Sequence, residues 1–216
     1  MRVRDRGFDQ QVVRSAYASV AHDYAENFGD DLSRLELDRR ILDLVAERTA
    51  GAGFVLDLGC GPAQVAGYLV ERGARSVGID FTGAMLRVAR QRARSLPLVA
   101  ADIRRLPIRS GVATGVVAFY VLQHLDRSEL PEALLEVRRV LADDGVFALA
   151  VHSGDGEFQV GEVTATAYQA DELTRQLGTA SLPVETVHHR GPLPHEHQGD
   201  RIYVVARAAR RAGDVR

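Results

Sequence analysis

The sequence predicts an α/β fold in which helices cover both faces of a mostly parallel sheet. Between residues 54 and 151, a short apolar segment followed by a helical pattern occurs four times, and a fifth apolar segment closes the series. These segments are nearly continuous apolar runs, which is typical of strands buried on both faces. Two later segments, 184–189 and 201–207, are joined by a loop too short for a crossover helix, so they must pair antiparallel. We therefore expect a seven-stranded sheet with an antiparallel last strand.

Two amphipathic helices are expected before the first strand. Residues 9–26 carry apolar side chains on one side. Residues 32–48 form the second helix, with Ser33 as the expected N-cap and Glu36 three positions further on. A break rich in glycine and alanine follows at 49–53 and separates these helices from the first strand.

The elements of the core follow from the apolar runs and the turn residues between them. The expected strands are 54–58, 76–80, 98–101, 112–120 and 145–151, and the expected helices are 63–72, 83–94, 128–141 and 171–177. Ser128 is the expected N-cap of the third of these helices. Residues 152–169 show no regular pattern, so we expect an irregular segment there.

Composition excludes several classes of protein. The 27 basic residues, all arginine, are balanced by 29 acidic ones, so the basic excess of a nucleic-acid-binding surface is missing. The longest apolar run is too short and too polar to span a bilayer, and the N-terminus lacks the apolar region of a signal peptide. Cys60 is the sole cysteine and cannot form an internal disulfide. We expect a cytoplasmic protein with neither a membrane nor a nucleic acid as partner.

The segment with the strongest chemical signal is VLDLGCGPA, residues 55–63, where an apolar strand runs into a glycine turn that opens a helix. Gly59 and Gly61 allow positive φ and let a ligand lie directly on the main chain at the start of that helix. Asp80 follows about 20 residues later at the end of the second strand, where an acid can accept hydrogen bonds from ribose hydroxyls. This pair of features fits NAD as well as S-adenosylmethionine.

Two details favour S-adenosylmethionine. The glycine turn does not have the GxGxxG spacing of dinucleotide-binding proteins. Asp57 precedes the glycines, where a carboxylate would repel a pyrophosphate but attract a cationic amine or sulfonium. An NAD-dependent oxidoreductase therefore remains only as an alternative.

These segments resemble a known family. VLDLGCGPAQVAGYL resembles motif I of class I, Rossmann-like S-adenosylmethionine-dependent methyltransferases, and the segments VGIDFTGAML, ADIRRLPI, VVAFYVLQHL and LLEVRRVLADDGVFAL resemble the units that follow it. The pattern is most similar to small-molecule enzymes related to quinone-biosynthesis methyltransferases. Ala63 stands where the family usually has a third glycine, and residues 143–145, Asp-Asp-Gly, replace its Pro-Gly-Gly turn. The resemblance implies a three-layer Rossmann-like methyltransferase fold.

The resemblance also implies S-adenosylmethionine as cofactor and a set of residues that contact it. Asp57, Gly59 and Gly61 would cradle the methionine part, and Asp80 would bind the ribose. The other expected contacts lie around the adenine and the reaction centre, and they are Phe81, Met85, Asp102, Ile103, Phe119 and Gln123. Core packing is the alternative for Met85 and Phe119, and a cap or turn role is the alternative for the two later aspartates.

Tyr17 and Tyr24 are seven residues apart and so lie on one face of the first helix. The phrase YASVAHDY that contains them resembles an entry helix of the family, which closes over the cofactor. Their hydroxyls are therefore expected to reach the cofactor carboxylate or the acceptor, with ordinary surface tyrosines as the alternative. On this basis the chain is a single domain, 1–216, with a helical lid at 1–50 and a Rossmann-like core at 51–216.

His124 is the candidate catalytic residue. The sulfonium already activates the methyl group, so the protein mainly supplies proximity and alignment, and a base is needed only if the acceptor must lose a proton. His124 follows the fourth strand, and an ordinary histidine pKa suits that task, although it could instead simply shape the wall of the site. The stretch 119–122, Phe-Tyr-Val-Leu, lacks the Asn/Asp-Pro-Pro-aromatic sequence of enzymes that methylate amide or nucleobase amines.

Four late histidines, at 188, 189, 195 and 197, surround the last loop, but no third ligand stands at a diagnostic spacing, so no metal is expected. Glu196 and Arg201 could form a salt bridge across this loop. The sequence thus predicts a methyltransferase, a monomer or homodimer, that moves a methyl group to O, N or C of a small-molecule acceptor. A non-catalytic S-adenosylmethionine-binding or scaffold protein is the second alternative.

Overall fold

The computed structural model describes residues 8–28, 31–194, 196 and 198–211. A seven-stranded sheet forms its centre, in the order β3-β2-β1-β4-β5-β9-β8. The strands of this sheet are β1 (Phe54–Leu58), β2 (Ser76–Asp80), β3 (Leu98–Ala100), β4 (Ala113–Phe119), β5 (Leu141–His152), β8 (Val184–Arg190) and β9 (Arg201–Arg207). The pairs among β3, β2, β1, β4 and β5 are all parallel, and β9 pairs antiparallel with both β5 and β8. The predicted sheet, with its antiparallel last strand, is confirmed.

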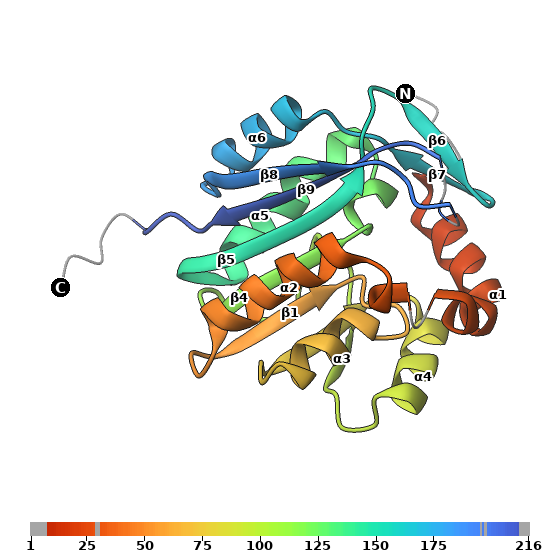
Figure 1. The fold of residues 1–216 in the computed structure, drawn as a ribbon, viewed down its shortest axis with the longest axis horizontal. Helices are drawn as coiled ribbons and strands as arrows, with labels where there is room; N and C mark the ends of the chain where they lie inside the picture. The colour runs from red at the N-terminus through yellow and green to blue at the C-terminus, as the bar shows by residue number, and fades with distance from the viewer. Residues whose placement is uncertain (1–7, 29–30, 195, 197, 212–216) are drawn as a thin grey trace.

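Helices cover both faces of this sheet (Figure 1). On one face, α2 (Glu36–Thr49) and α3 (Gln64–Glu71) pack on a cluster that includes Leu42, Val45 and Val117. On the other face, α5 (Leu130–Val140) and α6 (Ala170–Thr179) pack on a cluster that includes Leu134 and Phe147. α4 (Gly83–Arg92) lies beside α3, where small alanine side chains allow close approach. Every central strand is therefore buried on both faces, which is the reason for its continuous apolar sequence.

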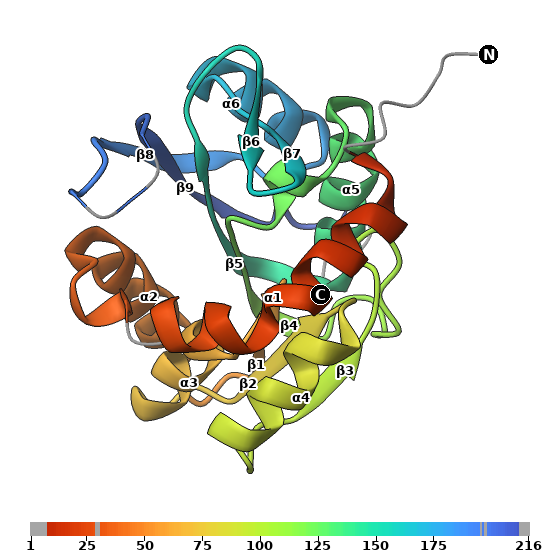
Figure 2. The same cartoon turned by 90° about the vertical axis from the view of Figure 1, so that its right-hand side faces the viewer.

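α1 (Gln10–Phe28) does not join either layer. It crosses the edge at which β1, β2 and β4 end, next to α4 and in front of the strand ends (Figure 2). α2, by contrast, packs on the sheet, so only the start of this second helix approaches the same edge. The division into a lid at 1–50 and a core at 51–216 stays a prediction.

The sequence predicts an irregular segment at 152–169, but the structure forms two strands there, so this prediction was wrong. β6 (Glu157–Val160) and β7 (Val163–Thr166) form an antiparallel hairpin separate from the main sheet. Gly161 opens its two-residue turn with a φ of 60°, which glycine adopts without strain. The hairpin lies beside α1 and extends the structure above the end of β5 (Figure 2).

The two predicted N-caps were also wrong. α2 begins after Leu35 rather than after Ser33, because a separate 3-10 turn, η2 (Asp31–Ser33), precedes it. Ahead of α5, the capping residue is Asp126, whose side chain accepts from the backbone N–H of Ser128 while Glu129 completes a capping box. In both places a short turn takes the position expected for the first turn of the α-helix. Among the described residues, no helix is long and apolar enough to cross a membrane.

Candidate functional site

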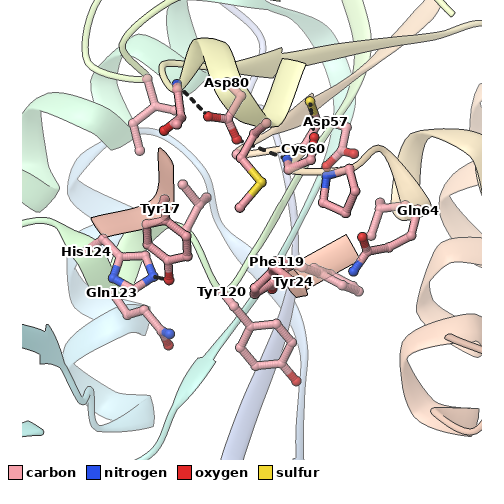
Figure 3. Close-up of a pocket in the computed structure, with 18 of the residues that line it drawn as sticks. Tyr17, Tyr24, Asp57, Cys60, Gln64, Asp80, Phe119, Tyr120, Gln123 and His124 are labelled. Atoms are coloured by element: carbon pink, nitrogen blue, oxygen red, sulfur yellow. Dashed lines mark hydrogen bonds between the residues drawn. The ribbon is translucent and has the colours of Figure 1, made fainter. Parts of the chain in front are cut away.

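A cavity of about 340 Å³ opens at the carboxyl ends of the parallel strands, beneath α1 (Figure 3). The strand order reverses between β1 and β4, which is the position where open α/β sheets bind ligands. The structure brings all thirteen predicted site residues together on the wall of this cavity, namely Tyr17, Tyr24, Asp57, Gly59, Gly61, Asp80, Phe81, Met85, Asp102, Ile103, Phe119, Gln123 and His124. Their individual roles remain predictions.

The glycine turn after β1 has the backbone that the sequence predicts. Gly59 and Gly61 have φ of 68° and 50°, in the left-handed region that side chains disfavour. A Cβ on Gly59 would lie 2.4 Å from a methyl of Val121, whereas a Cβ on Gly61 would meet open space. Ala63, in place of a third glycine, also has a positive φ of 69°, and its buried methyl packs among the alanines of α3 and α4. The departure is accommodated, although this conformation costs a non-glycine residue about 1 kcal/mol.

Asp80 holds the two loops of the site in place. Its carboxylate accepts hydrogen bonds from the N–H of Gly61 at 3.0 Å and of Thr82 at 2.7 Å. It therefore ties the glycine turn to the loop after β2. Burial raises the pKa of Asp80 even though these hydrogen bonds favour the ionised form.

Asp57 lies on the other side of the turn and is fully buried. Its carboxyl accepts the N–H of Ala66 at 3.0 Å, in the first turn of α3. Burial raises the pKa of Asp57 to about 8, and the nearby charge of Asp80 adds to this effect. A cationic ligand would relieve the cost of ionising this carboxyl.

The residues predicted to contact the adenine also contact other side chains of the protein. Met85 is buried, and Phe81 lies under the guanidinium of Arg14 at 5.3 Å. Asp102 lies on the cavity wall, but its carboxylate is held by Arg104, whose Nε donates at 3.0 Å. These contacts from Arg104 lower the pKa of Asp102 against the opposing effect of burial. An amine that bound Asp102 would share the carboxylate with this arginine.

His124 and Tyr17 meet across the cavity. The Tyr17 hydroxyl and His124 Nε2 are 2.8 Å apart, and the ring of Tyr24 packs edge-on against Tyr17 at 6.1 Å (Figure 3). Among the described residues, His124 Nδ1 has no hydrogen-bond partner, and it is buried. Desolvation lowers the pKa of His124 to about 4, so the imidazole is neutral at pH 7.

The buried neutral state of His124 predicts a pH-dependent stability. The unfolded chain takes up a proton near pH 6.5, whereas the folded chain takes it up only near pH 4, so unfolding becomes easier as the pH falls between these values. The difference corresponds to roughly 3 kcal/mol of unfolding free energy. We expect urea unfolding of His124→Gln to lose less stability than the parent between pH 7 and pH 4.5.

The raised pKa values of Asp57 and Asp80 stabilise the folded state as the pH falls, which opposes the effect of His124. The contribution of His124 to the unfolding free energy is therefore measured as the difference between His124→Gln and the parent. His22→Gln is the matched control, because His22 lies on the exposed side of α1. Parallel stability curves for His124→Gln and the parent would show that His124 is not held neutral by the fold.

Sequence reasoning missed the polar residues on the β5 and β9 side of the cavity. Tyr120 directly follows β4 with a φ of 59°, which is rare for a large residue and typical of functional sites. At the end of β5, His152 Nδ1 lies 2.9 Å from the Gln123 side-chain oxygen. Arg201 and Glu196 also line the cavity and form the salt bridge that the sequence suggested, at 3.8 Å, although Glu196 pairs more closely with Arg190. The register of β9 against β5 is what brings Arg201 to the same cavity as the glycine turn.

The late histidines form no metal site in the part of the chain that the structure describes. His188 and His189 are exposed on β8, and positions 195 and 197 lie outside the described residues.

Comparison with known proteins supports the predicted fold and family. Residues 56–149 match a family model described as a methyltransferase domain. The central segment of the chain is therefore similar to a methyltransferase domain. This match agrees with the resemblance to S-adenosylmethionine-dependent methyltransferases seen in the sequence, and neither alternative gains support.

Two curated relatives carry methyltransferase names. The chain is 35% identical over 156 residues to a malonyl-[acyl-carrier protein] O-methyltransferase from Geobacter sulfurreducens, covering 70% of this chain and 56% of the relative. It is 31% identical over 150 residues to a demethylmenaquinone methyltransferase from Corynebacterium urealyticum, covering 67% of this chain and 61% of the relative. The chain thus spans little more than half the length of these relatives.

A solved structure matches nearly the whole chain. It is the 1,6-didemethyltoxoflavin-N1-methyltransferase of Burkholderia thailandensis, crystallised with its acceptor and S-adenosylhomocysteine, with a TM-score of 0.78. The match covers 97% of this chain and 93% of that one at 20% sequence identity. At this identity the likeness establishes the fold, and the predicted Rossmann-like methyltransferase fold is confirmed.

Proposed function

We propose that this methyltransferase transfers a methyl group from S-adenosylmethionine to O, N or C of a small-molecule acceptor. The observation that carries this proposal is that one cavity holds the glycine turn, Asp57 and Asp80 at one end and a second set of polar side chains at the other. The relatives' names, with malonyl, quinone and toxoflavin acceptors, support a small acceptor but differ in its chemistry.

The residues at the turn fit the proposed cofactor. Gly61 leaves open space where a side chain would stand, so a ligand can lie against its main chain. Gln64, at the start of α3, presents a buried side-chain oxygen with no hydrogen-bond partner among the described residues, and this oxygen could accept from an ammonium group. Asp80 would bind the ribose hydroxyls, and Asp57 would offset the cationic charge. S-adenosylmethionine would supply a methyl group already activated by its sulfonium.

The chain's own contribution is alignment in a site shielded from water. α1 lies over the cavity, and Phe119 and Tyr120 form its floor at the end of β4, so an acceptor would approach from the β5 side. His124 is proposed as the base that accepts a proton from the acceptor, with Tyr17 holding its ring by the contact at 2.8 Å. Its low pKa keeps it unprotonated but makes it a weak base, so it suits only an acceptor whose proton is already acidic.

Binding and turnover test this function separately. Isothermal titration is expected to detect S-adenosylhomocysteine but not NADH. A panel of small phenols, carboxylic acids, amines and thiols is then offered with S-adenosylmethionine, and formation of S-adenosylhomocysteine is measured. Turnover with at least one acceptor is expected. Binding without turnover across the panel would instead support a non-catalytic binding protein.

The state of Asp57 predicts that cofactor binding strengthens as the pH rises. With a pKa of about 8, the carboxyl is mostly protonated at pH 7 and must ionise to attract a cation. S-adenosylhomocysteine lacks the sulfonium but carries an ammonium group, so its affinity should rise by up to about tenfold per pH unit between pH 6 and pH 8 if Asp57 interacts with that group. Titration in two buffers of different ionisation enthalpy should also detect proton release.

The control for this effect is Asp57→Asn, which keeps an oxygen for the Ala66 N–H but cannot ionise. Its affinity should be nearly independent of pH. A parent protein whose affinity is flat over the same range would show that Asp57 does not ionise on binding.

Three further predictions concern the protein's location, its oligomeric state and its partners. A cytoplasmic location, and a monomeric or homodimeric state without nucleic acid, stay predictions from the sequence. Light scattering on the purified protein, with and without added DNA or RNA, would test the last two.

A further inference from the structure

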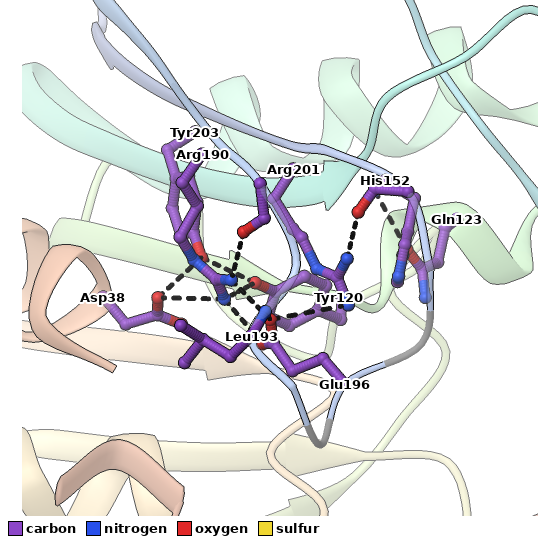
Figure 4. A network of polar contacts seen from close by, with 11 residues as sticks. Asp38, Tyr120, Gln123, His152, Arg190, Leu193, Glu196, Arg201 and Tyr203 are labelled. Carbon is purple, nitrogen blue, oxygen red and sulfur yellow. Dashed lines mark hydrogen bonds and ion pairs between the residues drawn. The ribbon is translucent and has the colours of Figure 1, made fainter. Parts of the chain in front are cut away.

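A cluster of charged and phenolic side chains closes the β9 side of the cavity (Figure 4). It comprises Asp38, Tyr120, Arg190, Glu196, Arg201 and Tyr203, which we call the acceptor-side cluster. The cluster stands apart from the glycine turn in the strand order, because β4 and β5 lie between β1 and β9. At about 4.8 Å per strand, three strand spacings place its members on β9, Arg201 and Tyr203, roughly 14 Å from β1.

Arg190 is fully committed within this cluster. Its two terminal nitrogens bind both carboxylate oxygens of Glu196, at 2.5 and 2.7 Å, and its Nε donates to the Tyr203 hydroxyl at 2.9 Å. The N–H of Leu193 also donates to Glu196, at 2.7 Å. Although burial acts to raise it, these contacts hold the pKa of Glu196 at about 2. Glu196 is thus ionised, and its acceptor positions are largely used by Arg190.

Arg201, unlike Arg190, has a nitrogen without a hydrogen-bond partner among the described residues. It is only 3% exposed and lines the cavity, yet its nearest carboxylate among the described residues, that of Glu196, is 3.8 Å away. One terminal nitrogen donates to the carbonyl of Gly199, and the Nε has no hydrogen-bond partner in the described part of the chain. Arg201 thus has one ion pair, with Glu196, but its buried Nε–H is unused, and a buried donor normally has a partner.

The two guanidinium groups of the cluster are balanced by two carboxyls at neutral pH, and protonation of Asp38 at lower pH would leave one positive charge uncompensated. Glu196 is paired with Arg190 and, at 3.8 Å, with Arg201. Asp38 lies 3.8 Å from Arg190 and accepts a hydrogen bond from the Tyr203 hydroxyl at 2.6 Å. Burial raises the pKa of Asp38 to about 6, despite that hydrogen bond, so this second carboxyl is neutralised in mildly acidic solution. Tyr120 and His152 supply further polar groups beside Arg201, which pairs with His152 in the sheet register.

We propose that Arg201 binds a carboxylate of the methyl acceptor, so that the substrates of this enzyme are small carboxylic acids. This inference rests on the proposed methyltransferase function. Arg201 acts in recognition: its planar guanidinium offers the free Nε–H and one terminal N–H side by side, which matches the two oxygens of a carboxylate. The β9 position places that group on the acceptor side, away from Asp57 and Asp80.

The test uses probes small enough to enter any acceptor pocket. Formate, acetate and benzoate are titrated into protein saturated with S-adenosylhomocysteine, and formamide, acetamide and benzamide serve as uncharged counterparts of the same shape. The readout is the Arg Nε–H resonance in ¹⁵N NMR that disappears in Arg201→Gln. We expect the carboxylates, but not the amides, to shift this resonance in the parent protein.

The variants give the second readout. Arg201→Gln should weaken benzoate binding at least tenfold, and Arg201→Lys should retain part of it. Arg207→Gln is the matched control, because Arg207 lies at the other end of β9 in an exposed pair with Glu185. This control should change neither benzoate nor S-adenosylhomocysteine affinity by more than twofold.

Three results would overturn the inference. The carboxylates could leave the resonance of folded parent protein unmoved, or Arg201→Gln could bind benzoate as the parent does. Alternatively, Arg201→Gln could lower S-adenosylhomocysteine affinity tenfold or more, which would assign the arginine to the cofactor. Failure of the parent to bind S-adenosylhomocysteine at all is a distinct result, because it removes the proposed function itself.

Discussion

Replacing Asp80 with alanine is expected to lower the affinity for S-adenosylhomocysteine by about 100- to 1000-fold, since each hydrogen bond to a charged group contributes about 1.5–3 kcal/mol. Two effects combine in this variant. The ribose would lose its charged acceptor, and the N–H groups of Gly61 and Thr82 would lose the carboxylate that now joins their loops. Isothermal titration measures the affinity, and thermal unfolding checks that the variant is folded.

Two further variants separate these effects. Asp80→Asn keeps an oxygen that can accept one of the two backbone N–H groups, so its loss of affinity should be intermediate. Asp43→Asn removes a carboxylate of similar size from α2, where Asp43 pairs with Arg72 outside the cavity, and should leave the affinity unchanged. If folded Asp80→Ala bound S-adenosylhomocysteine within threefold of the parent, the glycine turn and Asp80 would not form a nucleoside site.

The sequence predicted the sheet well because burial on both faces leaves a strong local pattern. β1, β2 and β9 have the bounds that their apolar runs indicate. The β6–β7 hairpin was missed although its signal is present, as two alternating tetrapeptides flank the turn at 161–162. Each strand is only four residues long, and β7 is buried at all four positions, so this short segment offers too few residues for a clear periodic pattern.

The glycine-turn side of the cavity was predictable for a similar reason. Asp57, Gly59 and Gly61 lie in one short segment, and Asp80 follows at a spacing set by one strand–helix–strand unit. The polar residues on the β9 side of the cavity come from α2, the end of β4, the end of β5 and the start of β9. These elements are far apart in the sequence, as the contact between residues 38 and 203 shows. Nothing local in the sequence brings Asp38 to Tyr203. Their contact depends on how α2 packs on the sheet and on the register of β9 against β5.

Replacing Gly59 with valine should abolish detectable binding of S-adenosylhomocysteine and lower the melting temperature by several degrees. A β-branched residue at a φ of 68° carries backbone strain of about 1–3 kcal/mol. The new Cβ would also lie 2.4 Å from Val121 Cγ2 and 2.5 Å from its Cβ, which is too close for a rotamer change to relieve. The turn would have to move, and with it the main chain on which the ligand is expected to lie.

Gly51→Val is the control that introduces backbone strain without a steric clash. Gly51 has a similar φ of 71°, but a Cβ there meets nothing within 4 Å, and the residue lies outside the cavity. This control should lose stability while keeping its affinity. Combining Gly59→Ala with Val121→Gly should recover part of the affinity that Gly59→Ala alone loses, because glycine at 121 removes both the contacting methyl groups and the Cβ. Equal affinities for Gly59→Val, Gly51→Val and the parent would mean that the ligand does not rest on this turn, and the assignment of the whole cavity would then fail with it.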